Sequence, residues 1–350
     1  MKSMKTGTMG VVLLAAAALG TGCPGLRPAE PGRQASGIVW PAAPQTPRIR
    51  FVRTLAVPED LGVRPGLWRR MRSAIKGVPR SRIVTPHGIH MSADGRLYVV
   101  DTFLRAVHVF DTQNSTYYQF PKQPLDGLIY PTAITAADDG RVYVSDPHAR
   151  AVHVFEDHGK RYVRAVGKDL LQRPTGLVVD HGRDELLVVD SLASRIVAFD
   201  LSSLEQKTAI GRDGRDDRSF HFPVGIALSP DGLVYVLDSM NFRVQVLDHD
   251  FRFLRSFGRA GIAPGSFSRP KGVALDSDGH VYVVDALFDN VQIFDRDGRL
   301  LMAFGSSGQA PGEFWLPNAI CIDADDRIYV SDSYNRRVQV FQYLNPARGS

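Results

Sequence analysis

The sequence predicts an all-β fold made of six similar four-stranded antiparallel sheets, and three observations lead to this expectation. A marker proline recurs at residues 86, 131, 174, 223, 270 and 317, with a period of 43 to 49 residues. A marker aspartate follows each proline after 15 or 16 residues, at 101, 146, 190, 238, 285 and 332. A turn separates two short apolar strands within each interval. Repeats of this length are typical of solenoids and β-propellers.

The fourth copy shows how one unit is built. Its segments alternate between apolar runs and turn residues, and they predict strands at residues 225–228, 234–238, 244–248 and 251–257. Asp231 and Gly232 form the turn of the first hairpin, and polar residues form the second turn. Four antiparallel strands per period are the blade of a propeller.

The first hairpin of each unit lies eight residues after the marker proline. Asp-Gly occupies this place at 94, 139, 231 and 278. We expect type I′ turns, which need positive φ at both central residues, so turn chemistry explains these aspartates. The marker aspartates are also expected to be structural, accepting backbone hydrogen bonds in the turn that follows them.

The sixth copy ends after its third strand, at residues 338–341, and therefore lacks an outer strand. The missing strand is present at the other end of the domain, where residues 48–57 resemble 251–257 in their alternation. We expect this closing strand to complete the last blade and remove its open edge. The domain is then one six-bladed β-propeller over 48–345, with the repeats at 86–341.

The repeat also resembles a known family. The pattern is clearest at 223–248 and 317–341, where it has three successive parts: Pro-x-Gly-Ile/Val, then Asp-Gly, then Val-Tyr-Val-x-Asp-Ser-x-Asn-x-Arg-Val-Gln-Val-Phe. This pattern is similar to the NHL repeat. The resemblance implies the propeller fold. It leaves the activity open, because NHL propellers include protein-binding, RNA-binding and lyase members.

The first 22 residues are typical of an export signal. Lys2 and Lys5 precede an uncharged stretch of about 11 residues, which is too short to span a bilayer. The run Leu19-Gly20-Thr21-Gly22-Cys23 resembles a bacterial lipoprotein processing box, although its branched residue lies four places before the cysteine and not three. The resemblance implies a lipid on Cys23 and a location in the bacterial envelope, at the periplasmic face or the outer membrane. A secreted form stays open as the alternative.

The segment that follows predicts a tether. Residues 23–47 contain prolines at 24, 28, 31, 41, 44 and 47 and show almost no periodicity. Cys23 and Cys321 are the two cysteines, so a lipid on Cys23 leaves Cys321 as an unpaired, buried thiol. The alternative is a disulfide between them, which predicts no lipid.

Residues 66–77 predict a basic amphipathic helix inserted before the first blade. Trp68 belongs to its apolar side, whereas basic residues lie largely off that side: Arg69, Arg70, Arg72 and Lys76. Two interpretations stay open, a helix packed on the propeller and a helix lying on a membrane surface. Export argues against a nucleic-acid partner, despite the net charge of +5.

Because strand direction alternates, the turn before each marker proline and the turn after each marker aspartate share one face, which we call the channel face. The residues just after the prolines should form an inner ring at its centre: His87, Thr132, Thr175, Val224, Lys271 and Asn318. Two places after the aspartates come mostly bulky apolar residues: Phe103, His148, Leu192, Met240, Leu287 and Tyr334. Packing between neighbouring turns and a docking surface for a partner are both open for this second set.

A catalytic reading has less support in the residues. NHL-like lyases hold zinc through histidines placed after the blade proline in three blades, and here His87 is the one histidine at such a place. His108 and His153 belong to third strands and are expected at the strand surface. We therefore expect no metal, no cofactor and no catalytic residue.

Together these patterns favour a noncatalytic binding or scaffold propeller, monomeric and anchored to the envelope, which recognises a protein, peptide or small ligand on its channel face. The alternative is a metal-dependent lyase or lactonase-type hydrolase acting at the same place.

Overall fold

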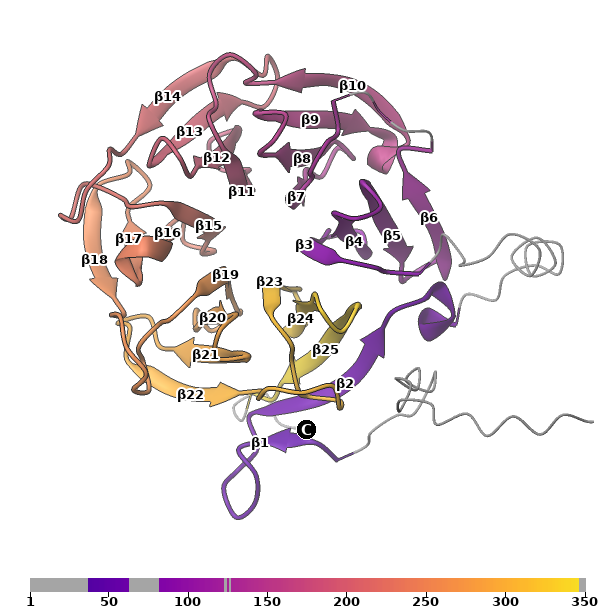
Figure 1. Cartoon of the computed structure of the whole chain (residues 1–350), viewed down its shortest axis with the longest axis vertical. Helices are drawn as coiled ribbons and strands as arrows, with labels where there is room; N and C mark the ends of the chain where they lie inside the picture. The colour runs from indigo at the N-terminus through magenta and orange to yellow at the C-terminus, as the bar shows by residue number, and fades with distance from the viewer. Residues whose placement is uncertain (1–36, 63–81, 123–124, 126, 346–350) are drawn as a thin grey trace, which may run out of the picture. The chain divides into compact units, whose positions relative to one another are not determined.

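The computed structural model describes residues 37–62, 82–122, 125 and 127–345. These residues form six antiparallel sheets arranged as blades around a common axis, with the first strand of each blade innermost (Figure 1). Helical structure in the described part consists of three short 3-10 turns, η1 (Pro58–Leu61), η2 (Asp157–Gly159) and η3 (Ser239–Asn241). The predicted all-β six-bladed propeller is confirmed.

The first three blades follow one another in chain order. Blade one contains β3 (Pro86–Met91), β4 (Arg96–Asp101), β5 (Ala106–Asp111) and β6 (Thr116–Phe120). Blade two contains β7 (Ala133–Ala136), β8 (Val142–Asp146), β9 (Ala151–Glu156) and β10 (Arg161–Val166). Blade three contains β11 (Pro174–Asp180), β12 (Glu185–Asp190), β13 (Arg195–Asp200) and β14 (Gln206–Ile210).

The last three blades use both ends of the domain. Blade four contains β15 (Pro223–Leu228), β16 (Val234–Asp238), β17 (Arg243–Leu247) and β18 (Phe253–Phe257). Blade five contains β19 (Pro270–Leu275), β20 (Val281–Asp285), β21 (Asn290–Phe294) and β22 (Leu300–Phe304). Blade six contains β23 (Pro317–Ile322), β24 (Arg327–Asp332) and β25 (Arg337–Tyr343), followed outward by β2 (Ile49–Leu55) and β1 (Val39–Trp40).

The hydrophobic core lies between neighbouring blades. One cluster combines Tyr98 and Val109 of blade one with Val142 and Phe155 of blade two, and similar clusters fill the other spaces. The second strand of a blade is covered on both faces, so all five residues of β16 are buried although Tyr235 and Asp238 are polar. This explains why these strands are continuous apolar runs that end at the marker aspartate.

Small residues let the innermost strands approach one another. A Cβ placed on Gly88 would lie 2.5 Å from the backbone of Thr132 and Ala133 in the next blade, and one on Gly176 would lie 2.8 Å from the Val224 carbonyl. Real Cβ atoms do not come this close, so glycine is required at these two places, whereas alanine holds the corresponding places of blades two and six. The inner strands are thereby held in fixed positions around the axis.

Hydroxyl groups link successive blades around the same axis. Thr102 donates to the Pro131 carbonyl at 2.9 Å, and Ser239 donates to the Pro270 carbonyl at 3.0 Å. Ser333 of blade six makes the same bond to the Pro86 carbonyl of blade one at 2.6 Å. The junction that closes the ring is therefore made like those inside it.

The closing strand predicted at 48–57 is confirmed as β2. It pairs antiparallel with β25, placing Phe51 opposite Phe341 and Leu55 opposite Val338. Ile49, Phe51 and Leu55 are buried and their rings and side chains complete the core of the last blade. An N-terminal segment thus covers the edge that β25 would otherwise expose.

The structure corrects the extent of the predicted tether. Within 23–47, Val39 and Trp40 form β1 and pair with Arg50 and Ile49 of β2. Trp40 packs against Phe304 and Phe341 with ring centroids 5.7 and 5.8 Å apart. Residues 38–40 are apolar, unlike the proline-rich residues around them, and their side chains become partly buried against blade six. This burial explains why the segment folds onto the blade.

The turn type of the first hairpins also differs from expectation. Gly95 and Gly140 have φ of 80° and 82°, but the aspartates before them are not among the residues with positive φ. Gly95 donates to the Ser92 carbonyl, and Ser92 donates to the Arg96 carbonyl. These are type I turns followed by a left-handed glycine, the usual three-residue hairpin loop.

Several predicted features lie outside the described residues: the export signal at 1–22, Cys23, the first part of the tether, and the helix at 66–77 with Trp68, Arg69, Arg70, Arg72 and Lys76. Among the residues that are described, no helix is long and apolar enough to cross a membrane.

Candidate functional site

The buried marker aspartates fix the turns of the channel face. Asp146 accepts hydrogen bonds from Ile129 and Tyr130, before the marker proline, and from His148 and Ala149, after the aspartate, at 2.5 to 2.9 Å. Asp285 receives the equivalent bonds from both turns of blade five. The structural role expected for these residues is confirmed, and the carboxylates of Asp146 and Asp285 each tie together two turns where one was expected.

The electrostatics of blade one show what these bonds do. Burial alone would raise the pKa of Asp101, but hydrogen bonds from His108 and from the backbone of Val84 and Leu104 outweigh it and lower the pKa. The carboxylate is therefore ionised at neutral pH. An ionised, buried acceptor holds the backbone of both turns more firmly than a neutral one.

The second set of face residues is exposed. The side chains of Phe103, Leu192, Met240, Leu287 and Tyr334 are 71, 60, 51, 59 and 61% exposed, and His148 is exposed as well. Contacts between neighbouring turns therefore leave at least half of each of these five residues exposed. These six residues stand at equivalent places around the axis, and we call them the apolar ring.

Aromatic residues before the marker prolines extend the apolar ring. Tyr130 stacks on His148 with centroids 4.9 Å apart, and Trp315 lies against Tyr334 at 5.5 Å. Tyr130 and Trp315 are themselves 43 and 44% exposed. The sequence argument missed these two residues, although both stand one or two places before a marker proline.

The inner ring is less uniform than expected. Thr132 is only 6% exposed, and its backbone N–H bonds to the Ser145 carbonyl, so it does not face a ligand. Thr175 shares a hydrogen bond with Ser191 at 2.7 Å. His87, Thr175, Val224, Lys271 and Asn318 are partly buried, as residues lining an inner surface should be.

His87 is a hydrogen-bonded, neutral histidine. Its Nδ1 lies 2.8 Å from the Thr132 carbonyl, an acceptor, so Nδ1 carries the proton and donates it. Burial, together with the smaller effect of the positive charge of Lys271, lowers the pKa of His87 to about 4, although the hydrogen bond to Thr132 acts in the opposite direction. Within the described residues no group of three or more His, Cys, Asp or Glu is arranged to hold a metal ion.

The other two candidate histidines occupy interior places. His108 and His153 are almost completely buried, which corrects the expectation of a strand surface. His108 Nε2 lies 3.2 Å from Asp101, as Gln245 Nε2 lies 3.2 Å from Asp238 in blade four. Histidine here replaces a glutamine that supports the marker aspartate, and its role is structural.

Cys321 belongs to inner strand β23. Its thiol is free and partly buried against the cluster between blades six and one, and burial raises its pKa. A protonated thiol of this kind is a poor nucleophile.

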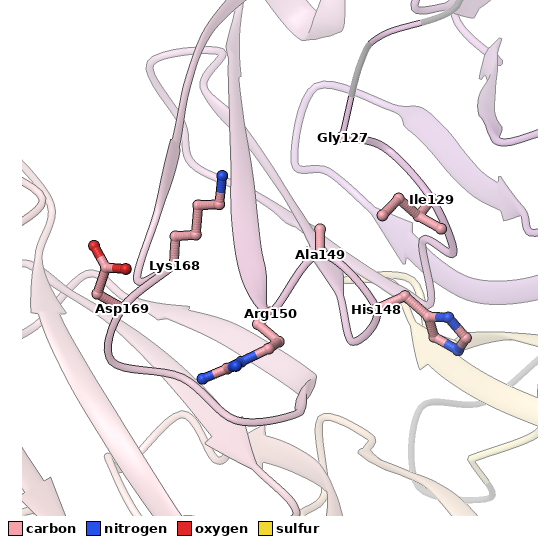
Figure 2. Close-up of a pocket in the computed structure, with 7 residues that line it drawn as sticks. All are labelled: Gly127, Ile129, His148, Ala149, Arg150, Lys168 and Asp169. Carbon is pink, nitrogen blue, oxygen red and sulfur yellow. The ribbon is translucent and has the colours of Figure 1, made fainter.

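A hollow of about 470 Å³ lies beside the apolar ring, where blades two and three meet. Figure 2 shows Lys168 and Asp169 on one side of it and Ile129 and His148 on the other. Arg150 also lines it and donates to the Leu171 carbonyl at 3.3 Å. The lining combines apolar residues with two basic residues and one acidic residue, Asp169.

Two family models match parts of the chain. Residues 220–247 match the NHL repeat, and residues 272–344 match a model described as a 6-bladed beta-propeller. A comparison with curated proteins gives no match.

Solved structures of similar fold have diverse roles. Virginiamycin B lyase from Staphylococcus aureus is 13% identical, with a TM-score of 0.54 over 75% of this chain and 96% of that one. An auxiliary nutrient binding protein from Bacteroides thetaiotaomicron is 14% identical, with a TM-score of 0.58 over 75% and 69%. Regucalcin from Agrobacterium tumefaciens, a calcium-binding protein, is 14% identical, with a TM-score of 0.54 over 75% and 90%.

Identities this low show the fold and leave the activity to the site. The six sheets and the two family models agree: the chain is a six-bladed β-propeller, and its fourth blade matches the NHL repeat.

Proposed function

We propose that this protein is a noncatalytic binding propeller that docks a peptide segment of an envelope protein on its channel face. The observation that supports this most is the apolar ring. Its five residues other than His148 are 51 to 71% exposed, and all six stand on turns that follow the buried marker aspartates. Large apolar side chains gathered on one surface usually mark an interaction site.

The turns themselves support recognition over a purely structural role. Hydrogen bonds to the buried marker aspartates fix the backbone under Phe103, His148 and Leu287. A partner therefore meets a surface that is already ordered, and little conformational entropy is lost on binding. Burying apolar area of this surface contributes about 25 cal/mol per Å².

Catalysis has weaker support in the same residues. A catalytic zinc site typically takes three protein ligands, and the inner ring offers His87 alone among residues 87, 132, 175, 224, 271 and 318. Metal analysis of the purified full chain tests the alternative. A stoichiometric, tightly held Zn²⁺ or Ca²⁺ would favour a lyase or hydrolase.

Selection from a random peptide display library, followed by fluorescence anisotropy of the selected peptides, tests the binding proposal. We expect the double variant Phe103→Ser, Leu287→Ser to bind at least about tenfold more weakly, because each residue buries an apolar side chain on docking. Leu301→Ser is the matched control, since Leu301 is a 51% exposed leucine on outer strand β22. Peptides that lose affinity with Leu301→Ser and ignore the double variant would contradict the proposal.

We also propose that the protein acts as a monomer held at the bacterial envelope by a lipid on Cys23, with the basic segment 66–77, for which the sequence predicts a helix, as a second contact. Mass spectrometry of the full chain expressed in a bacterium tests the anchor. The wild-type protein should carry a diacylglycerol and an acyl group that Cys23→Ala lacks. Wild-type protein without an added acyl mass would contradict it.

A further inference from the structure

Lys271 of the inner ring has an unusual environment. It is partly buried on inner strand β19, next to the axis. Its side chain takes part in none of the hydrogen bonds or ion pairs among the described residues, whereas Lys160 and Lys207 pair with Asp157 and Glu185. A partly buried ammonium that lacks a carboxylate partner is expensive to maintain.

The charges that act on Lys271 have the same sign. Burial lowers the pKa of Lys271, and the positive charges of Arg269 and Arg173 lower it further. Arg173 and Arg269 stand directly before the marker prolines of blades three and five, and both side chains are exposed. Neither forms an ion pair within the described residues.

The backbone of both arginines is held in place. The N–H of Arg173 donates to Asp190 at 2.7 Å, and that of Arg269 donates to Asp285 at 3.0 Å. Arg173 also lies over the ring of Phe222, with 5.4 Å to its centroid. The two arginine side chains therefore extend from turns whose backbone is fixed by hydrogen bonds.

Carboxylates of the channel face do not act as partners of Lys271. Of the six turns that follow the marker aspartates, one contains an acidic residue, Asp289, and its carboxylate already accepts the N–H of Leu316 at 2.7 Å. The segments before the marker prolines contain Asp169, Asp213, Asp216, Asp217 and Glu313, but the charges that act on the pKa of Lys271 are those of Arg269 and Arg173. Like charges at close range destabilise the folded protein unless an anion neutralises them. A bound anion would supply the missing partner.

We propose that Lys271, Arg173 and Arg269 form an anion subsite at the centre of the channel face, which binds a carboxylate of the ligand that docks on the apolar ring. The inference rests on the proposed function and adds a ligand class to it: a peptide with a free carboxylate next to apolar side chains. Asn318 is the next inner-ring residue after Lys271, and its backbone carbonyl lies next to Gly272, the residue that follows Lys271. Phosphate is the other oxyanion that such a group accepts.

Small probes test the subsite without a known partner. N-acetyl-Phe-Leu with a free C-terminal carboxylate and its C-terminal amide differ in one charge, and their affinities for the full chain are measured by ligand-observed NMR titration at low salt. We expect the acid to bind about tenfold more tightly than the amide, as charge-assisted hydrogen bonds allow. Lys271→Met should abolish this preference, and Lys271→Arg should retain most of it.

Lys160→Met is the control, because it removes one lysine charge that is paired with Asp157 away from the channel face. It should leave the preference within about twofold, since exposed charges act weakly over long distances in salt. Displacement of the acid by inorganic phosphate would extend the subsite to oxyanions in general, and absence of displacement would restrict it to carboxylates. Equal affinity for acid and amide, or a preference that survives Lys271→Met, would overturn the subsite.

The two proposals fail separately. If Phe103→Ser, Leu287→Ser weakens both probes equally while the preference for the acid persists, both proposals stand. If the double variant leaves both probes and the selected peptides unaffected while Lys271→Met removes the preference, the subsite stands and the docking surface is wrong.

Discussion

The two faces of the propeller handle their charges differently. On the face that bears the first hairpins, aspartates pair with arginines two residues on in the same turn, as Asp139 with Arg141 at 2.5 Å and Asp297 with Arg299 at 2.8 Å. On the channel face, Arg212 pairs with Asp216 and Arg243 with Asp238, but five arginines form no ion pair within the described residues: Arg105, Arg150, Arg173, Arg269 and Arg336. The channel face therefore leaves cations and apolar groups open to a partner.

This difference between the two faces separates groups that maintain the fold from groups that are free to bind a partner. Ion pairs at an exposed surface contribute between about 0 and 1 kcal/mol each, so the hairpin face gains solubility and turn geometry from them and little stability. The channel face combines buried carboxylates, which hold its turns, with exposed groups that contribute nothing to folding. Each of the following predictions either sharpens this contrast or breaks it.

The largest effect is expected from removing the strand that both faces depend on. Deletion of residues 48–57 uncovers the edge of β25 and removes three buried side chains, Ile49, Phe51 and Leu55. At about 1.5 to 3 kcal/mol for each, the loss is roughly 5 to 9 kcal/mol, enough to unfold a protein of ordinary stability. Thermal melts monitored by circular dichroism measure it.

Deletion of residues 37–41 is the milder control, because it removes β1 and leaves β2 paired with β25. Its midpoint should fall by less than that of the longer deletion. If the deletion of 48–57 melted at the wild-type temperature, the closing strand would not hold the ring together.

The next effect separates the aspartates of the two faces. Asp146→Ala leaves four backbone N–H groups without their acceptor and should cost about 3 to 5 kcal/mol. Asp139→Ala, in the hairpin of the same blade, loses one exposed ion pair and should cost about 1 kcal/mol or less. Denaturant titration compares them, and equal losses would remove the distinction between the faces.

A third prediction concerns acid. Because the folded pKa of His87 is lowered to about 4 from 6.5, the unfolded state binds the proton first, and stability falls as pH drops from about 6.5 to 4. The full shift corresponds to about 3 kcal/mol. His87→Gln keeps a donor for the Thr132 carbonyl and should lose this part of the acid dependence, as measured by denaturant titration between pH 7 and 4.

His249→Gln is the control, since the side chain of His249 is 71% exposed in a turn of the hairpin face. It should follow the wild-type pH profile. A His87→Gln profile that is also unchanged would show that His87 is not held in its neutral form.

The sequence predicted the parts of the fold that depend on local repetition. Marker prolines, marker aspartates and short apolar strands recur in each copy, so the blade count could be inferred from spacing, and the closing strand at 48–57 from its alternation. Trp40 was missed because its burial depends on contacts with Phe304 and Phe341, which are far away in sequence. The interior position of His108 was missed for the same reason.

The sequence predicted which positions belong to the candidate site, but it did not predict which of their side chains are exposed. Equivalent positions in the six copies indicated the apolar ring and the inner ring, but only the structure decides that Phe103 is exposed and Thr132 is buried. Arg173 and Arg269 gave no periodic signal, because the residue before the marker proline varies between blades. Their relation to Lys271 arises from the closure of the ring around one axis.

The smallest effect on stability comes from the residue with the most specific proposed role. Lys271→Met removes an ammonium that the charges of Arg173 and Arg269 disfavour and keeps the length of the side chain, so the variant should be as stable as the wild type or more stable by about 1 kcal/mol. Lys160→Met loses its contact with Asp157 and should gain nothing. Midpoints of thermal unfolding distinguish the two variants. A clear loss of stability in Lys271→Met would mean that the lysine serves the fold, because a charge kept for a ligand stabilises only the complex.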